Sequence, residues 1–236
     1  MLRYALFDLD NTLYPPDAGV WGAITERINL YMTERLQLPP AEAVALRRHY
    51  LHTFGTTLNG LRQDFGVDAL DYLDFVHDLP LDRYLRPAPA LDAMLGRLPL
   101  VKVIFTNADE RHAGRVLDRL GIGRHFTRII DIVALDFVNK PEPAAYRRAL
   151  QLLAAQAPEC VFADDTPYNL PPAHDLGMCT VLVGSPPQVG GTPLVGGSPP
   201  AGAAPSAGVD HHIAHILELE NLLATVPCRS EGFSSG

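Results

Sequence analysis

The segment 7–13, FDLDNTL, places two carboxylates, Asp8 and Asp10, at the end of an apolar run that begins at Tyr4. Residues i and i+2 of a strand project to the same side, so both acids would face one cleft where the strand ends. Open α/β sheets bind their ligands at that carboxyl edge. Two acids this close repel each other unless a cation lies between them or one of them holds a proton. The pattern therefore predicts a site for a cation and for proton transfer.

Length and charge narrow the class of protein. The 236 residues suffice for one sizeable core, or for a core domain with a modest insertion. The net charge of −8 argues against a nucleic-acid-binding surface, which is normally basic. The chain enters the first predicted strand without a signal-peptide pattern, and no apolar run reaches the roughly 20 residues that span a bilayer. We expect a cytoplasmic monomer or homodimer that binds neither nucleic acid nor membrane.

The three cysteines, Cys160, Cys179 and Cys228, are far apart and form no CxxC motif. Cys160 and Cys179 lie in apolar, strand-like runs, where we expect buried thiols. An odd number of cysteines in this arrangement predicts neither a disulfide framework nor a zinc site.

Short apolar runs alternate with segments of helical periodicity, which is typical of a parallel α/β sheet. The predicted strands cover residues 4–9, 100–105, 129–133, 160–163 and 179–183. Helical spacing occupies 110–120 and 141–153, between strands. We predict a Rossmann-like three-layer core with a mainly parallel sheet.

The gap between the first two strands is unusually long. About 85 residues separate them, far more than one crossover helix requires. Helical patterns recur in this gap, near residues 23–32, 39–52, 57–64 and 69–77. We predict an all-helical cap domain inserted over residues 15–89, with the catalytic core at 1–14 and 90–227.

Two segments have the composition of flexible chain. Residues 184–208 are rich in Pro, Gly, Ser and Ala and contain the near-repeat GGTP and GGSP, so we predict a flexible surface loop. Residues 211–223 then predict a short final strand and a helix. The tail at 228–236 is predicted to be disordered.

Four polar segments follow predicted strands, and each supplies a group that phosphoryl transfer needs. Asp8 can attack phosphorus, and Asp10 can protonate the leaving alkoxide and then take a proton from water. The alternative for this pair is an ordinary polar turn. Thr106 and Asn107 can hold a phosphate oxygen through a hydroxyl and a backbone N–H. They could also simply cap the next helix.

The other two segments contain Lys140 and the acids Asp164 and Asp165. Lys140 is placed to neutralise Asp8 and the transferring phosphoryl group, although an exposed surface lysine is the alternative. Burying two unpaired acids at a strand end is costly, and a helix cap would need only one of them. Mg²⁺ prefers oxygen ligands, so we expect Asp165 to bind it directly and Asp164 to bind it through water.

In this order, the four segments resemble the motifs of the haloacid dehalogenase superfamily of phosphatases, up to about residue 184 and again from about 209. The resemblance implies that Asp8 is a nucleophile that becomes an aspartyl phosphate and that Asp10 is the general acid/base. It implies phosphate binding by Thr106 and Lys140. It also implies that Mg²⁺ is held by Asp8, the backbone carbonyl of Asp10, Asp164 and Asp165.

Three further segments, NTLYPP at 11–16, FGTTLNGL at 54–61 and VHDLP at 76–80, are similar to the pyrimidine 5′-nucleotidase group. Members of this group hydrolyse nucleoside monophosphates such as UMP and CMP. The resemblance implies a small phosphorylated substrate, first a pyrimidine nucleoside monophosphate. Phosphoglycolate, a sugar phosphate or lysophosphatidic acid are alternatives. The expected substrate and phosphate contacts are Asn107, Thr12, Asn11, Thr57 and Asn59, with Asn169 in support.

Other reactions on this scaffold remain alternatives. A dehalogenase needs Asp8 but neither Asp10 nor Mg²⁺, so Asp10 and the acid pair argue against it. A phosphomutase shares every motif and differs in retaining the phosphoryl group until substrate rebinds. A non-catalytic binding protein should have lost Asp8, Asp10 or Lys140, and all are present.

Two other features allow more than one interpretation. His211, His212 and His215 could pair as metal ligands, but the more favoured interpretation is a solvated strand end. Trp21 could stack on a nucleobase or belong to the core of the cap.

Overall fold

The computed structural model of the chain describes residues 1–184 and 208–225. In these ranges six strands form one parallel sheet in the order β3-β2-β1-β4-β5-β6. The predicted α/β fold with a parallel, Rossmann-like sheet is therefore confirmed. The strands are β1 (Tyr4–Phe7), β2 (Val101–Phe105), β3 (Phe126–Ile130), β4 (Cys160–Asp164), β5 (Cys179–Val183) and β6 (His211–Ile213).

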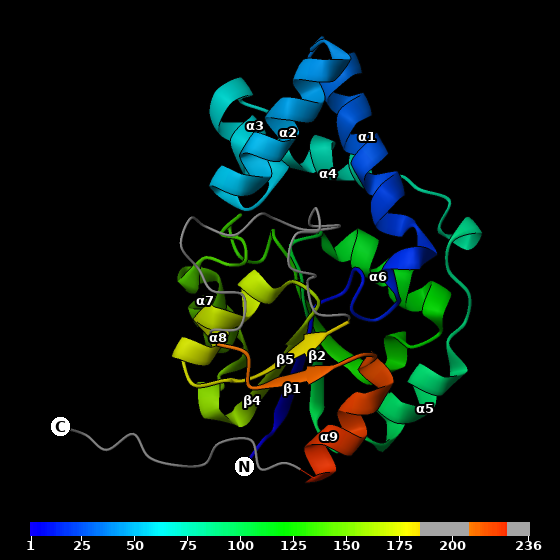
Figure 1. Cartoon of the computed structure of the whole chain (residues 1–236), viewed down its shortest axis with the longest axis vertical. Helices are drawn as coiled ribbons and strands as arrows, with labels where there is room; N and C mark the ends of the chain where they lie inside the picture. Colours follow the sequence, from blue (N-terminus) through cyan, green and yellow to red (C-terminus); the bar gives the residue numbers. More distant parts are fainter. Residues whose placement is uncertain (185–207, 226–236) are drawn as a thin grey trace, which may run out of the picture.

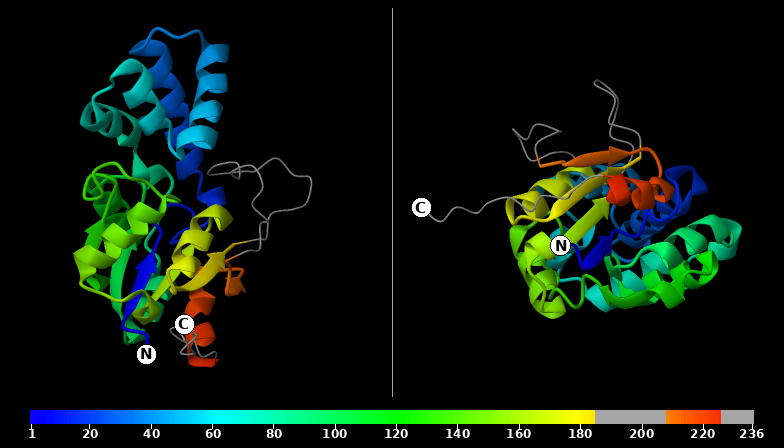
Figure 2. Two further views of the ribbon diagram at one scale, coloured as in Figure 1. Left: turned by 90° about the vertical axis from the view of Figure 1, so that its left-hand side faces the viewer. Right: turned by 90° about the horizontal axis from the view of Figure 1, so that it is seen from below.

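Helices cover both faces of the sheet (Figures 1 and 2). Successive residues of β1 point to opposite faces, so Ala5 and Phe7 join one apolar cluster and Leu6 joins the other. The first cluster includes residues of α5 (Pro89–Arg97), α6 (Glu110–Leu120) and α9 (Leu219–Thr225) and continues into the helices at 20–77. The second is completed by α7 (Pro143–Leu153) and α8 (Leu170–Asp175).

Of the helices between β1 and β2, the first four, α1 to α4, stand above the carboxyl edge of the sheet (Figure 1). They begin close to where the helical patterns predicted them. Capping explains two starts, because Thr56 and Asp68 accept hydrogen bonds from the backbone N–H three residues later, at 3.3 and 2.9 Å. The helices are α1 (Val20–Glu34), α2 (Pro40–Phe54), α3 (Thr57–Phe65) and α4 (Ala69–His77).

The third strand differs from its prediction, because β3 ends at Ile130 and 129–133 was expected. Asp131 stops the strand: its carboxylate accepts hydrogen bonds from the N–H groups of Ala134 at 2.8 Å and Glu110 at 2.9 Å. The next apolar residue, Ile132, is buried in the following turn. An edge strand with polar, exposed residues gives little periodic signal.

The cysteine prediction is half right. Cys160 is a buried free thiol, but Cys179 is disulfide-bonded, which corrects the expectation of a thiol there. Spacing along the chain does not tell which sulfur atoms the fold brings together. Cys228, the predicted loop within 184–208 and the predicted tail at 228–236 lie outside the described residues, apart from the loop's ends at 184 and 208. No helix in the described ranges is long and apolar enough to cross a membrane.

Candidate active site

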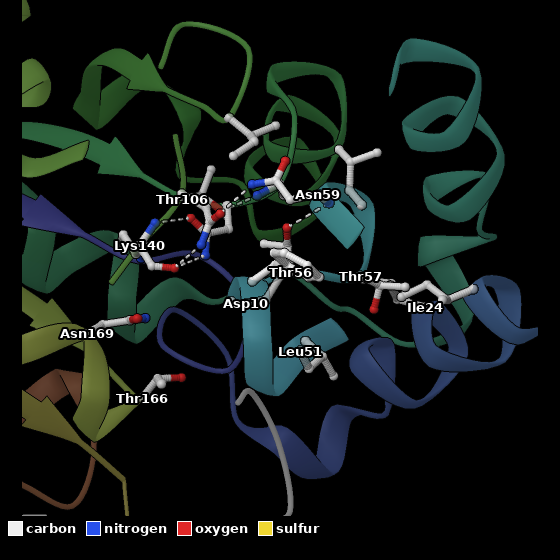
Figure 3. Close-up of a pocket in the computed structure, with 18 of the residues that line it drawn as sticks. Asp10, Ile24, Leu51, Thr56, Thr57, Asn59, Thr106, Lys140, Thr166 and Asn169 are labelled. Carbon is white, nitrogen blue, oxygen red and sulfur yellow. Dashed lines mark hydrogen bonds between the residues drawn. The ribbon is translucent and has the colours of Figure 1, made fainter. Parts of the chain in front are cut away.

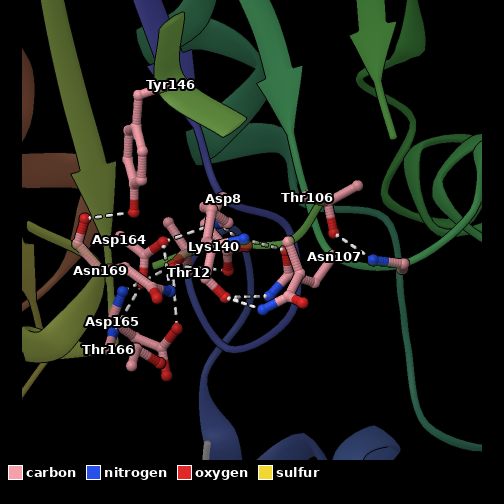
Figure 4. Close-up of polar contacts among 12 residues, drawn as sticks. Asp8, Thr12, Thr106, Asn107, Lys140, Tyr146, Asp164, Asp165, Thr166 and Asn169 are labelled. Atoms are coloured by element: carbon pink, nitrogen blue, oxygen red, sulfur yellow. Dashed lines mark hydrogen bonds and ion pairs between the residues drawn. The ribbon is translucent and has the colours of Figure 1, made fainter. Parts of the chain in front are cut away.

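The carboxyl ends of β1, β2 and β4 meet at the centre of the sheet, where the strand order reverses. The backbone N–H of Asp8 donates to the carbonyl of Ala163 at 2.9 Å, so the end of β1 is tied to the end of β4. Asp164 is the last residue of β4, and Thr106 follows β2. Ligands bind in the crevice at such a reversal point. The fold thus brings three of the four predicted polar segments to one place (Figure 4).

Lys140 brings the fourth segment to the same place. Its side chain is 1% exposed, and Nζ donates to Asp8 Oδ1 at 2.8 Å and to Asp164 Oδ2 at 2.7 Å. Burial alone would lower the pKa of Lys140, but the two carboxylates raise it above its usual value. The lysine therefore keeps its charge inside the protein. The alternative of an exposed surface lysine is wrong.

The backbone of Lys140 is held by asparagines. Asn107 Oδ1 accepts from the Lys140 N–H at 2.8 Å, and Asn107 Nδ2 donates to the Lys140 carbonyl at 3.0 Å. Asn139 Nδ2 donates to the same carbonyl at 2.7 Å. From α3, Asn59 Nδ2 donates to Asn139 Oδ1 at 2.6 Å and to the Phe137 carbonyl at 3.0 Å. The side chains of Asn107 and Asn59 thus support the lysine loop, a role that the sequence did not predict.

Asp164 is fully buried, and both of its oxygens accept hydrogen bonds. Asn169 Nδ2 lies 3.0 Å from each oxygen, and the Thr166 N–H donates to Oδ1 at 2.8 Å. Tyr146 holds Asn169 in turn, by donating to its carbonyl at 2.6 Å. With Lys140 also bound, Asp164 anchors the site.

Three carboxylates form the described cluster that could hold a metal ion: one oxygen each of Asp8, Asp164 and Asp165 lies within 4.8 Å of the others. Thr12 Oγ1 sits among them, 3.3 Å from Asp8 Oδ2 and 3.3 Å from Asp165 Oδ1, and accepts from the Asp165 N–H at 3.0 Å. The side chain of Asp10 is not in this cluster, so only its backbone carbonyl is left for the predicted metal role.

The charges in this cluster fit a divalent cation. Burial, with repulsion from Asp164, raises the pKa of Asp8 to about 7 despite the nearby Lys140. Burial and repulsion from Asp8 and Asp164 raise the pKa of Asp165 well above its usual value. A hard cation would relieve this repulsion and accept the oxygen donors that are present.

Asp10 faces a different set of partners. Its Oδ1 lies 2.9 Å from His112 Nε2 and accepts a hydrogen bond from the Tyr14 hydroxyl. Burial alone would raise the pKa of Asp10, but His112 and Tyr14 lower it below its usual value. Sequence reasoning missed His112. The one available signal was a histidine three residues after the N-cap Asp109, next to Ala113 on the buried side of α6.

A cavity of about 470 Å³ opens between this sheet edge and the inserted helices (Figure 3). The predicted residues that line it are Asp8, Asp10, Asn11, Thr57, Asn59, Thr106, Asn107, Lys140, Asp165 and Asn169. Trp21 lines it too and is partly buried, so it is both cavity wall and packing residue. Other apolar wall residues include Ile24, Ile28, Leu51, Leu58, Leu73 and Val76.

The histidines near the carboxyl-terminal strand are not part of the three-acid cluster. His212 is exposed, and His215 Nδ1 accepts from the Leu217 N–H at 3.2 Å, which caps a short helix. Within the two described ranges, a cluster of potential metal ligands occurs only at Asp8, Asp164 and Asp165.

Two named proteins are similar to this chain in sequence. Phosphate metabolism protein 8 of Saccharomyces cerevisiae is 30% identical over 194 residues, which is 75% of this chain and 60% of the yeast protein. Bifunctional epoxide hydrolase 2 of Rattus norvegicus is 42% identical over 62 residues, which is 26% of this chain and 11% of the rat protein. The chain thus spans less than two thirds of the length of these relatives.

Solved structures share the fold over nearly the whole chain. An L-2-haloacid dehalogenase from Xanthobacter autotrophicus has a TM-score of 0.61 at 19% identity and covers 96% of this chain and 100% of its own. A HAD phosphatase from Thermococcus onnurineus has a TM-score of 0.58 at 18% identity, with 94% and 98% covered. The family described as haloacid dehalogenase-like hydrolase matches residues 2–177. The chain therefore belongs to the haloacid dehalogenase-like hydrolases.

Proposed function

We propose that this hydrolase is a Mg²⁺-dependent phosphomonoesterase that acts through an aspartyl phosphate on Asp8. Pyrimidine nucleoside 5′-monophosphates are the first substrates to consider. The observation that carries the proposal is the buried Lys140, whose ammonium joins Asp8 to Asp164 beside the three-acid cluster. A buried cation next to a nucleophilic carboxylate suits a substrate that brings its own negative charge.

In the first step a carboxylate oxygen of Asp8 forms a bond to phosphorus while the bond to the leaving oxygen breaks. Thr106 Oγ1 accepts from the Ala108 N–H at 3.0 Å, so its own proton is free to donate to a phosphate oxygen. Lys140 offsets negative charge on the phosphoryl group. Because Asp10 is ionised before substrate binds, it first takes the proton of the phosphate monoester monoanion and then gives it to the leaving oxygen.

In the second step water attacks phosphorus, Asp10 takes the proton, and the bond between phosphorus and Asp8 breaks. This restores the carboxylate of Asp8 and releases inorganic phosphate. Mg²⁺ would be held directly by Asp165, Asp8 and the backbone carbonyl of Asp10, and through water by Asp164. The ion would supply charge neutralisation on the phosphoryl oxygens.

We further propose that residues 15–89 act as a cap that excludes water and selects the leaving group. The cavity volume lies within the range of small-molecule sites. Trp21 presents an aromatic surface in its wall, which a nucleobase could stack on. Thr57 and Asn59 lie in the same wall and remain predicted substrate contacts.

Dehalogenation is the second candidate, because several structures with this fold carry that name. A halide leaves without a proton, so a dehalogenase has no use for Asp10 as an acid. Nor would it need three clustered carboxylates. Phosphate-ester hydrolysis uses both features.

The test is phosphate release from UMP, CMP, AMP, GMP, phosphoglycolate, a sugar phosphate, lysophosphatidic acid and p-nitrophenyl phosphate, with and without Mg²⁺. We expect Mg²⁺-dependent release, fastest from UMP and CMP, and loss of at least about 10³-fold in Asp8→Asn. Fastest release from another ester would support the proposed reaction but contradict the proposed pyrimidine nucleotide substrate. Halide release from a 2-haloacid, without phosphate release from any ester, would overturn the proposal.

A further inference from the structure

The two oxygens of Asp10 have unequal surroundings. Oδ1 accepts from Tyr14 and lies 2.9 Å from His112 Nε2. In the part of the chain that the structure describes, no group donates a hydrogen bond to Oδ2. Because both donors reach the same oxygen, they fix the plane of the carboxyl group and leave Oδ2 for the cavity that Asp10 lines.

His112 makes its ring hydrogen bond only to Asp10 among the described residues. The ring is 0% exposed, and Nδ1 is buried without a described partner. Since an ionised carboxylate only accepts, Nε2 carries the proton that it donates to Asp10. A buried polar atom without a partner costs stability, so a histidine kept here for packing alone would be a poor choice.

A second histidine, from the inserted helices, holds the ring of His112. The rings of His77 and His112 stack with centroids 4.3 Å apart and planes 21° apart. His77 is the last residue of α4, and its Nδ1 pairs with Asp109, the N-cap of α6. Arg115 of α6 also donates to the His77 carbonyl at 2.8 Å. The end of α4 is thus fastened to α6 through both the side chain and the backbone carbonyl of His77.

We propose that His112 and Tyr14 are positioning residues that present Oδ2 of Asp10 to the reacting oxygen, and that His77 links this orientation to the seat of the inserted helices. The inference rests on the proposed role of Asp10 as general acid/base. Misplacement of a catalytic group by about 1 Å can cost roughly 10²-fold in rate. The link would make proton transfer efficient only while α4 is docked on α6.

The test compares two leaving groups in one protein. The first substrate is the alkyl phosphate that the enzyme hydrolyses fastest in the panel above, and its leaving oxygen needs a proton. The second is p-nitrophenyl phosphate, whose leaving oxygen does not. Rapid-quench release of the alcohol or the phenol reports the first step alone. The variants are His112→Phe, which keeps the ring, His112→Gln, which keeps a donor near the Nε2 position, and Tyr14→Phe, which loses only a hydroxyl.

We expect His112→Phe to slow alcohol release about 10- to 100-fold and phenol release less than about 3-fold. His112→Gln should recover most of the loss, and Tyr14→Phe should show the same selectivity more weakly. His77→Ala should give a selective loss that is absent when His112 is already Phe. The matched control is His125→Phe, at the amino end of β3, which should change neither rate.

Equal losses on both esters in folded His112→Phe and Tyr14→Phe would overturn the inference, because a general packing defect predicts equality. Thermal unfolding of each variant identifies those that have lost the fold. If His112→Phe is among them, the rates of folded Tyr14→Phe on the two esters decide between positioning and packing. Asp10→Asn separates this inference from the proposed function. If Asp10→Asn is selective and the His112 and Tyr14 variants are not, only the positioning role fails. If Asp10→Asn is not selective either, the role of Asp10 itself fails.

Discussion

Lys140 Nζ lies 2.8 Å from Asp8 Oδ1, although 132 positions separate the two residues in the chain. The contact is possible because the loop before α7 returns to the carboxyl end of β1. Lys140 also binds Asp164 at 2.7 Å, so one ammonium ties two strand ends together. The candidate nucleophile and the centre of the fold therefore depend on the same side chain.

Replacing Lys140 by Met should destabilise the protein by about 3–5 kcal/mol at pH 7.5, because it leaves buried carboxylates without their cation. Urea unfolding in EDTA measures this loss. The matched control is Lys102→Met: Lys102 is also buried, but Nζ donates to the carbonyls of Leu98 and Leu100, at 2.7 and 2.9 Å. We expect about 1–2 kcal/mol there. Equal losses in the two variants would contradict the interpretation.

Asp165→Asn should raise the Mg²⁺ concentration for half-maximal activity by about 10-fold or more, because it removes one charge from the three-acid cluster. Activity titrations with Mg²⁺ after EDTA treatment measure the shift. Asp175→Asn is the control, since the Asp175 side chain is 81% exposed and lies outside the cluster. An unchanged Mg²⁺ requirement in Asp165→Asn would remove this residue from the metal site.

The sequence predicted the sheet, the inserted helices and the residues at the strand ends because these follow from local patterns. Alternation of side chains places Asp8 and Asp10 after β1, and helical spacing marks α1 to α4. The contact of Asp10 with His112 joins residues 102 positions apart, and that of Asn59 with Asn139 joins residues 80 positions apart. Such contacts depend on how the helices dock, which periodicity does not describe.

The same limit explains why the sequence did not predict how the side chains of Asn59 and Asn107 support the lysine loop, and gave them as substrate or phosphate contacts. Each side-chain amide binds the loop around Lys140. A polar residue near a motif carries no sign of whether it faces the ligand or a neighbouring loop. Their predicted contacts with substrate stay predictions.

Acid should destabilise the protein through His77. Burial, with repulsion from His112, lowers the pKa of His77 below 6.5, although Asp109 and Asp10 oppose this. The unfolded chain therefore binds a proton at a higher pH than the folded protein does. The stability that neutral His77 contributes is fully present above about pH 6.5, and it is lost as the pH falls from 6.5 through the lowered pKa of His77.

We expect the free energy of unfolding of His77→Phe to fall less between pH 7.5 and 5 than that of the wild type. Denaturant titrations at both values, in EDTA, give the difference. The comparison between variants cancels the acid cluster, whose raised pKa values act with the opposite sign. His49→Phe is the control, because His49 lies on an exposed part of α2. An equal fall in His77→Phe and wild type would show that His77 does not titrate in this way.

Two glycines within helices should respond to alanine with opposite signs. Gly60 lies in α3, and a Cβ there would overlap the ring of Tyr50, which is 1% exposed. Gly114 lies in α6, and nothing lies within 4 Å of a Cβ added to it.

Alanine favours a helix over glycine by about 0.5–1 kcal/mol, so Gly114→Ala should raise stability by that amount. Gly60→Ala gains the same propensity but forces the ring aside, at a cost of about 1–3 kcal/mol, so it should lower stability. Thermal and urea unfolding of both variants measure the direction of each stability change.

Because Gly60 adjoins Asn59, Gly60→Ala should also weaken the support of the lysine loop and lower activity, whereas Gly114→Ala should not. A stabilised Gly60→Ala would show that α2 and α3 can move apart, and so that the wall of the cavity is less tightly packed than its contacts indicate.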